Sequence, residues 1–115
     1  MRRIALASAL ILLSIAPAFA QNFEGNWGCR DTSLVKTGIL TIYGQVYGFA
    51  STVVGDKSSG TGTITAYQDG VGLNDGGLKT TRAIQQGRLI PDPTYGTAIQ
   101  LETADAIVML CTPRF

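Results

Sequence analysis

The 115-residue chain carries nine basic and eight acidic side chains, for a formal net charge of +1, and it contains no histidine. This balance excludes the basic surface of a nucleic-acid-binding protein. The missing histidine excludes a histidine-based triad, a histidine-ligated metal and a histidine pH switch. Fourteen glycines, together with many threonine, valine, isoleucine and tyrosine residues, predict strands joined by tight turns.

The first 20 residues have the pattern of a secretory signal peptide. Two arginines precede an apolar run from 4 to 15, and Ala18–Ala20 forms an A-x-A cleavage site. The run is shorter than the roughly 20 apolar residues that a membrane span needs. We therefore expect a helical signal peptide over 1–20 that is cleaved after Ala20. A single β-rich domain over 21–115 would then be exported to the periplasm or the medium, with no transmembrane span.

The first strand of the mature domain is expected at 23–29, where residues alternate with the period of two that one buried face produces. Within it, Phe23–Trp27 resembles the G-x-W motif on the first strand of lipocalin-like (calycin) barrels. The resemblance implies structural roles for Gly25 and Trp27, with the tryptophan closing one end of a barrel. Small bacterial proteins of similar form include exported protease inhibitors and biotin-binding barrels.

Two cysteines lie near the two ends of the mature chain, Cys29 in the first strand and Cys111 in the last. An even count in an oxidising compartment favours one disulfide, and two buried free thiols are the alternative. A catalytic thiol is not expected, because no histidine is present to activate it.

The second and third strands are expected at 38–43 and 46–52, as a hairpin. Gly44, the first of the two loop residues between them, fits a type II′ turn. That register makes three opposing pairs: Tyr43 with Val46, Ile42 with Tyr47, and Leu40 with Phe49. The expected structural core of the domain is then Phe23, Gly25, Trp27, Leu40, Ile42, Tyr47 and Phe49.

The rest of the chain reads as a polar loop at 53–60 followed by short strands at 61–67, 71–73, 78–84, 88–90, 97–102 and 107–111. No helix is expected in the mature chain. About eight strands, spaced by about 12 residues, predict an all-β antiparallel meander. A bridge between its first and last strands favours a closed or nearly closed barrel, with a β-sandwich as the alternative.

The last hairpin has two readings that differ in loop length. A two-residue loop would bury two polar side chains, so we expect a three-residue loop at 104–106 that pairs Leu101 with Met109. Since Cys111 must point inward, Ile107 would point inward too. Apolar side chains left on the outside, together with one loop tyrosine, form a candidate binding surface: Ile39, Tyr43, Val46, Tyr95, Val108 and Leu110.

Residues that could carry chemistry are few. The aspartates lie in turns, their spacing fits no calcium loop, and the serines have no general base. We therefore expect neither an enzyme nor a cofactor or metal site. The hypothesis we favour is a binding or inhibitor-like module for a protein or small ligand of the cell envelope. The alternative is a structural or envelope-interaction protein that associates, also with itself, through an apolar outer sheet face.

Overall fold

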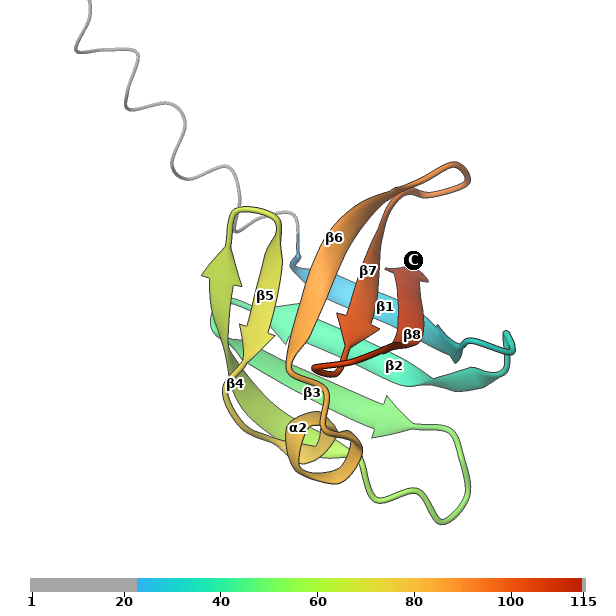
Figure 1. Ribbon diagram of the computed structural model, residues 1–115, viewed down its shortest axis with the longest axis vertical. Coiled ribbons are helices and arrows are strands. Elements are labelled where there is room, and N and C mark those ends of the chain that lie inside the picture. Colours follow the sequence, from blue (N-terminus) through green and yellow to red (C-terminus); the bar gives the residue numbers. More distant parts are fainter. Residues whose placement is uncertain (1–22, 115) are drawn as a thin grey trace, which may run out of the picture.

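The computed structural model describes residues 23–114, and the predicted signal peptide lies outside the described residues. Eight antiparallel strands, each bonded to the next, close into a barrel because the first also pairs with the last (Figure 1). The elements are β1 (Gly25–Asp31), β2 (Lys36–Tyr43), β3 (Val46–Ser51), β4 (Gly60–Tyr67), β5 (Gly70–Leu73), α2 (Gly77–Arg82), β6 (Gln86–Asp92), β7 (Gly96–Glu102) and β8 (Ile107–Pro113). The predicted closed antiparallel barrel is confirmed.

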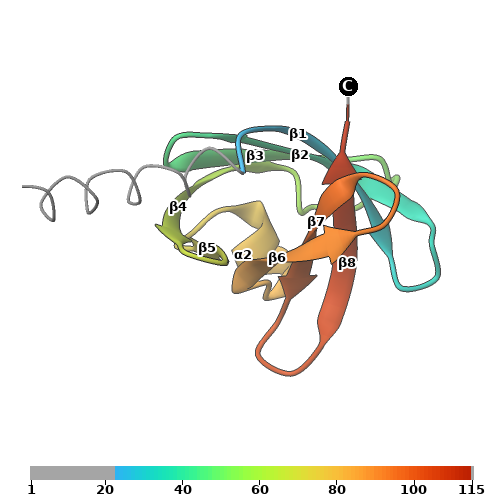
Figure 2. The ribbon, with the colours of Figure 1, turned by 90° about the horizontal axis from the view of Figure 1, so that it is seen from above.

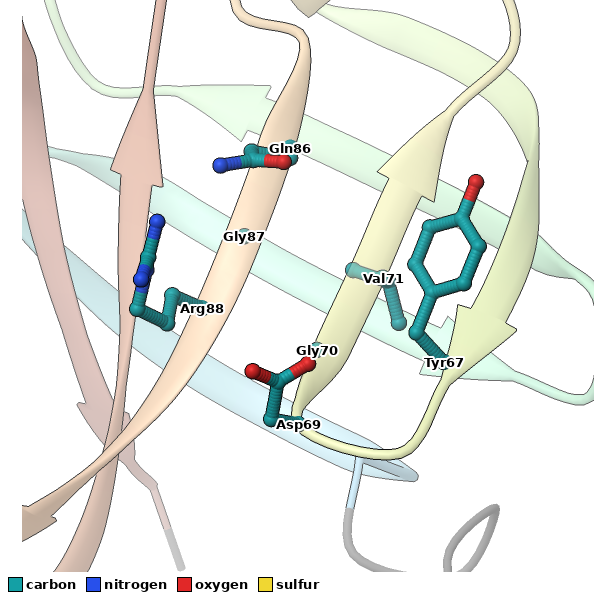
Figure 3. Close-up of a pocket in the computed structure, with 7 residues that line it drawn as sticks. All are labelled: Tyr67, Asp69, Gly70, Val71, Gln86, Gly87 and Arg88. Atoms are coloured by element: carbon teal, nitrogen blue, oxygen red, sulfur yellow. The ribbon is translucent and has the colours of Figure 1, made fainter.

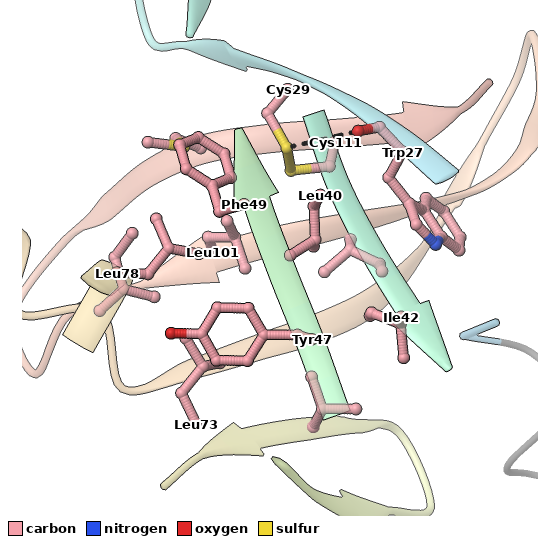
Figure 4. Close-up of a cluster of buried hydrophobic side chains, with 14 of the residues drawn as sticks. Trp27, Cys29, Leu40, Ile42, Tyr47, Phe49, Leu73, Leu78, Leu101 and Cys111 are labelled. Carbon is pink, nitrogen blue, oxygen red and sulfur yellow. Dashed lines mark hydrogen bonds between the residues drawn. A yellow bond between two sulfur atoms is a disulfide. The ribbon is translucent and has the colours of Figure 1, made fainter. Parts of the chain in front are cut away.

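The disulfide lies at the seam of the barrel, which is the pairing of β1 with β8. Cys29 is directly opposite Cys111 in the register of these two strands, and their sulfur atoms are bonded. Both cysteines are buried, and Figure 4 shows their bridge among the core side chains. The predicted Cys29–Cys111 bridge is confirmed, and it joins the two strands that come from opposite ends of the chain.

The hairpin of β2 and β3 has the register that its sequence predicts. Tyr43 is opposite Val46, and the next inward pairs follow in step. Gly44 has a φ of +59°, and Gln45 is not among the non-glycine residues with positive φ, as a type II′ turn requires. Alternation of side chains and one glycine are therefore enough to specify this part of the barrel.

The predicted strand at 78–84 is wrong, because this segment forms the short helix α2. Its threonines suggested a strand, but tertiary packing overrides this local preference. Leu78 and Ile84 are both fully buried, and Gly77 packs so closely on the Ser58 backbone that a Cβ atom would collide with it. Seen from above, α2 lies within the ring of strands (Figure 2). The helix therefore plugs the barrel, and β6 begins after it.

The last hairpin confirms the pairing of Leu101 with Met109 but contradicts the predicted direction of two neighbours. Glu102 pairs with Ile107, so Val108 is an extra residue in β8, as in a β-bulge. The bulge turns Ile107 outward, where it is 49% exposed, and lets Val108 pack against the core. The cause is a loop longer than predicted, in which the Thr103 hydroxyl accepts two backbone N–H groups.

The barrel interior is filled by its own side chains. The residues expected in the core are buried there, apart from Gly25, which is half-buried with a φ of +119°. Figure 4 shows Leu40, Tyr47 and Leu101 converging on the centre. A barrel of this size is expected to be packed in this way, so binding is to be sought on its wall and at its ends.

Candidate functional site

Two neighbouring turns at one end of the barrel expose four aliphatic side chains. They are Leu34 and Val35 between β1 and β2, and Val53 and Val54 between β3 and β4, with exposed fractions of 71%, 57%, 42% and 100%. The Thr52 N–H donates to the Thr37 carbonyl of β2 at 3.0 Å, so the two turns leave from adjacent ends of β2 and β3. Figure 1 shows both at the same end of the barrel. We call these four residues the turn surface.

The β1–β2 turn is held rigid by Asp31. One of its carboxylate oxygens accepts the backbone N–H groups of Ser33 at 2.9 Å and Val35 at 3.0 Å. The Leu34 N–H donates to the Asp31 carbonyl at 3.0 Å. Leu34 itself has a φ of +68°, a conformation that costs a non-glycine residue about 1–2 kcal/mol. The turn therefore carries backbone strain at a residue whose side chain faces solvent.

The β3–β4 turn is anchored by Asp56. Its carboxylate accepts the hydroxyls of Ser51 and Ser58 at 2.6 Å each, and it pairs with Arg82 of α2 at 2.8 Å. These hydrogen bonds, that from Arg82 first, hold the pKa of Asp56 well below its ordinary value of 3.8. The helix that plugs the barrel thus also fixes the loop that presents Val54.

Acid should loosen this anchor. Because the pKa of Asp56 is lowered on folding, its contribution to stability is complete above pH 3.8 and is lost as pH falls toward the folded pKa. We expect the free energy of unfolding, measured by urea denaturation, to drop as the pH falls through about 4 and below, and to drop less in Asp56→Asn. Glu102, whose pKa is also lowered, would supply part of the remaining slope. If the unfolding free energy depended on pH equally in both proteins, the Asp56 charge would not have a stabilising role.

The candidate surface residues predicted from the outer strand faces do not form one patch. Tyr43 and Val46 face each other beside the β2–β3 turn and are 63% and 51% exposed. Leu110 is 36% exposed and lies opposite Arg30 of β1. Val108, predicted to look outward, instead packs against the core. These residues therefore do not make the continuous apolar outer face that a structural or envelope-interaction protein would need.

The other two predicted residues, Ile39 and Tyr95, line one pocket of about 220 Å³ on the barrel wall. Gly28 of β1 lies in this pocket, opposite Ile39 on one side and Thr112 of β8 on the other. Tyr95 reaches it from the turn between β6 and β7. We call this concavity the outer-wall pocket.

Three basic side chains, which the sequence analysis did not single out, also line the outer-wall pocket. Arg30 and Lys36 face each other across β1 and β2, and Arg114 follows the end of β8. No acidic residue within 23–114 lines the pocket, and none of the three cations forms an ion pair with another described residue. Arg30 and Arg114 are far apart in the sequence and come together only through the pairing of β1 with β8, so the sequence alone does not reveal this cluster.

A smaller pocket of about 90 Å³ lies between β5 and β6 (Figure 3). Three polar side chains line it besides Tyr67: Asp69, Gln86 and Arg88. Gln86 and Arg88 are directed to Glu102, with Arg88 at 3.3 Å. Gln100 and Gln86 donate to the same carboxylate and, with Gln100 first, lower the pKa of Glu102. Because Glu102 engages Gln86 and Arg88, these two side chains belong to a surface hydrogen-bond network.

Comparisons with protein-family models, with curated proteins and with solved structures give no match. Within residues 23–114, no helix is long and apolar enough to cross a membrane. The same part of the chain contains no group of three acidic or cysteine side chains placed to hold a metal ion. The class that the fold defines is a small, closed, eight-stranded barrel with a filled interior.

Proposed function

We propose that the protein is an exported, inhibitor-like binding module that holds a partner protein through the turn surface. The observation that carries this proposal is the exposure of four aliphatic side chains, Val54 completely, on two turns that are hydrogen-bonded into fixed shapes. Exposed apolar groups gathered at one place mark interaction sites. Turns that are already ordered lose little conformational entropy on binding, which favours affinity.

The charged side chains beside the turn surface indicate what kind of surface the partner presents. Lys36 is the first residue of β2, directly after Val35, and Lys57 lies in the connection that presents Val54. The nearby carboxylates of Asp31 and Asp56 are occupied by hydrogen bonds inside the turns. A protruding apolar surface with basic neighbours fits an apolar cleft with an acidic rim. Four side chains cover only on the order of a few hundred Å², so a stable interface of about 800 Å² per partner must include the surrounding barrel wall.

Export is part of the same proposal. The leader has the pattern of a signal peptide, and disulfides such as Cys29–Cys111 persist in oxidising compartments. A partner would therefore be met in the cell envelope or outside the cell.

The double variant Leu34→Asn, Val54→Asp should bind the partner at least about tenfold more weakly, since truncating central interface residues typically costs 2 kcal/mol or more. Asparagine tolerates the positive φ of Leu34 better than leucine does, so the Leu34→Asn substitution should leave thermal stability unchanged or raised. Binding is measured by quantitative capture from an envelope extract of the source cells, and the isolated partner is then titrated against each variant.

The matched control is Tyr43→Thr, Val46→Thr, which removes two exposed apolar side chains beside a different turn. This control should bind like the unmodified protein. Loss of the partner in the control and not in Leu34→Asn, Val54→Asp would place the site on the β2–β3 turn. If the captured protein is a second copy of this chain, the structural alternative is the better reading.

A further inference from the structure

Gly28 is the residue that gives the outer-wall pocket its depth. It sits at an outward position of β1 with an ordinary φ, and a Cβ atom added there would meet nothing within 4 Å. By contrast, a Cβ on Gly38, Gly62 or Gly87 would collide with neighbouring atoms, so packing explains those glycines. A glycine inside a strand weakens it and often marks a place where a ligand approaches the backbone. Gly28 has no packing reason of this kind.

The electrostatics of the outer-wall pocket favour an anion. Arg30 and Lys36 stand at one end and Arg114 at the other, while the other two arginines of the described barrel, Arg82 and Arg88, are paired with acids. The register places Arg114 beside Asn26 and Lys36 beside Arg30. These levels are four residues apart on β1, which an extended strand spans in about 13 Å. Basic side chains can therefore contact a negatively charged head group at either end of the pocket.

The walls of the pocket favour an apolar body on that anion. Ile39 supplies an aliphatic side and Tyr95 an aromatic one, with the bare backbone of Gly28 between Ile39 and Thr112. A volume of about 220 Å³ is below the 300–1,000 Å³ of sites for drug-sized ligands, so the occupant is small.

We propose that the outer-wall pocket binds a small organic anion, with an aryl or alkyl body against Ile39 and Tyr95 and an acidic head group on the basic side chains. Arginine and lysine accept carboxylate and phosphate heads alike, so the proposal names their shared negative charge. This site adjoins the turn surface, because Arg30 donates to the Leu34 carbonyl at 3.0 Å and Lys36 directly follows Val35. Its ligand is held by the pocket walls, however, and not by the four aliphatic side chains of the turn surface.

The test is an NMR titration of the mature protein with 1-naphthoate and 1-naphthyl phosphate, which share a body and differ in the head. We expect saturable shifts at Gly28, Ile39 and Thr112, with a dissociation constant below about 1 mM. Inorganic phosphate, which lacks the body, and 1-naphthalenemethanol, which lacks the charge, should each bind at least about tenfold more weakly if both parts contribute. The stronger of the two anionic probes identifies the preferred head group.

Gly28→Leu should fill the pocket and weaken naphthoate binding at least about tenfold. Thermal stability should be unchanged or raised, because a Cβ atom at this position meets nothing within 4 Å and glycine weakens a strand. Gly48→Leu is the matched control. It is also a strand glycine with ordinary φ and room for a Cβ atom, and its concavity is lined by no charged residue. Lys36→Gln should weaken binding about two- to fivefold, and added salt should weaken it further.

Several results would overturn the proposal. They are the absence of saturable shifts below about 1 mM, equal binding of the uncharged probe, or an equal loss in Gly48→Leu. Should Gly28→Leu fail to fold, the Lys36→Gln and salt measurements decide the question. Leu34→Asn, Val54→Asp should keep full naphthoate binding, and Gly28→Leu should keep the partner protein, so failure at one site is distinguishable from failure at the other.

Discussion

Replacing Trp27 by alanine should lower the free energy of unfolding by about 3–5 kcal/mol, the range for truncating a buried aromatic side chain. Trp27 is 3% exposed and lies in register between Leu40 of β2 and Pro113 of β8, so it packs at the seam. Its indole N–H donates to the Phe23 carbonyl at 2.9 Å, which holds the start of the described chain against the barrel. Urea denaturation followed by far-UV circular dichroism measures the loss.

Two further variants separate the causes. Trp27→Phe keeps most of the packing and removes the hydrogen bond to Phe23, so it should cost less than the alanine change, by at least about 1 kcal/mol. Tyr43→Ala removes an aromatic side chain that is 63% exposed and should change stability by no more than about 0.5 kcal/mol. A loss below about 1 kcal/mol for Trp27→Ala would mean that this residue does not anchor the core.

The barrel could be predicted because its strands alternate and its turns carry recognisable residues. The β2–β3 register follows from the pairing of Tyr43 with Val46 around Gly44, and a one-residue slip would expose the whole inward face. The disulfide then adds the long-range information that local pattern lacks, since it places β1 beside β8. Local alternation and one covalent constraint together specify a closed meander.

Helix α2 could not be predicted in the same way. Its six residues are too few to show a helical period, and Thr80 and Thr81 favour a strand locally. What selects the helix is the open end of the barrel, which needs an apolar plug, and Leu78 fills it. That requirement exists only once the strands have closed.

The turn surface was missed for a related reason. A polar composition hides Val53 and Val54, which stand beside Gly55, Asp56 and a run of polar residues. Alternation reports which side chains of a strand are buried, but it is silent about residues in turns. Exposure there depends on the hydrogen bonds to Asp56, which come from Ser51, Ser58 and a helix the pattern did not predict.

Removing the Cys29–Cys111 bridge should lower the free energy of unfolding by about 4–5 kcal/mol, because the bridge closes a loop between residues 82 positions apart. A small domain has about 5–15 kcal/mol in total, so the reduced protein should be marginal near body temperature. The double variant Cys29→Ala, Cys111→Ala and the reduced protein are compared with the oxidised protein by urea denaturation.

If the disulfide stabilises the protein by restraining the unfolded chain, a second result is expected that a simple loss of core packing would not produce. A bridge that restrains the unfolded chain keeps it more compact, so its removal should raise the dependence of unfolding free energy on urea as well as lower stability. Reductant should leave the stability of the Cys29→Ala, Cys111→Ala variant unchanged, which controls for the other effects of the reductant.

In the protein without the bridge, amide exchange should be fastest along the β1–β8 seam, at Gly28 and Thr112, and slowest in β2 and β3. A loss below about 1 kcal/mol, with an unchanged urea slope, would instead mean that the backbone hydrogen bonds of the seam and the side chains around Trp27 close the barrel without help.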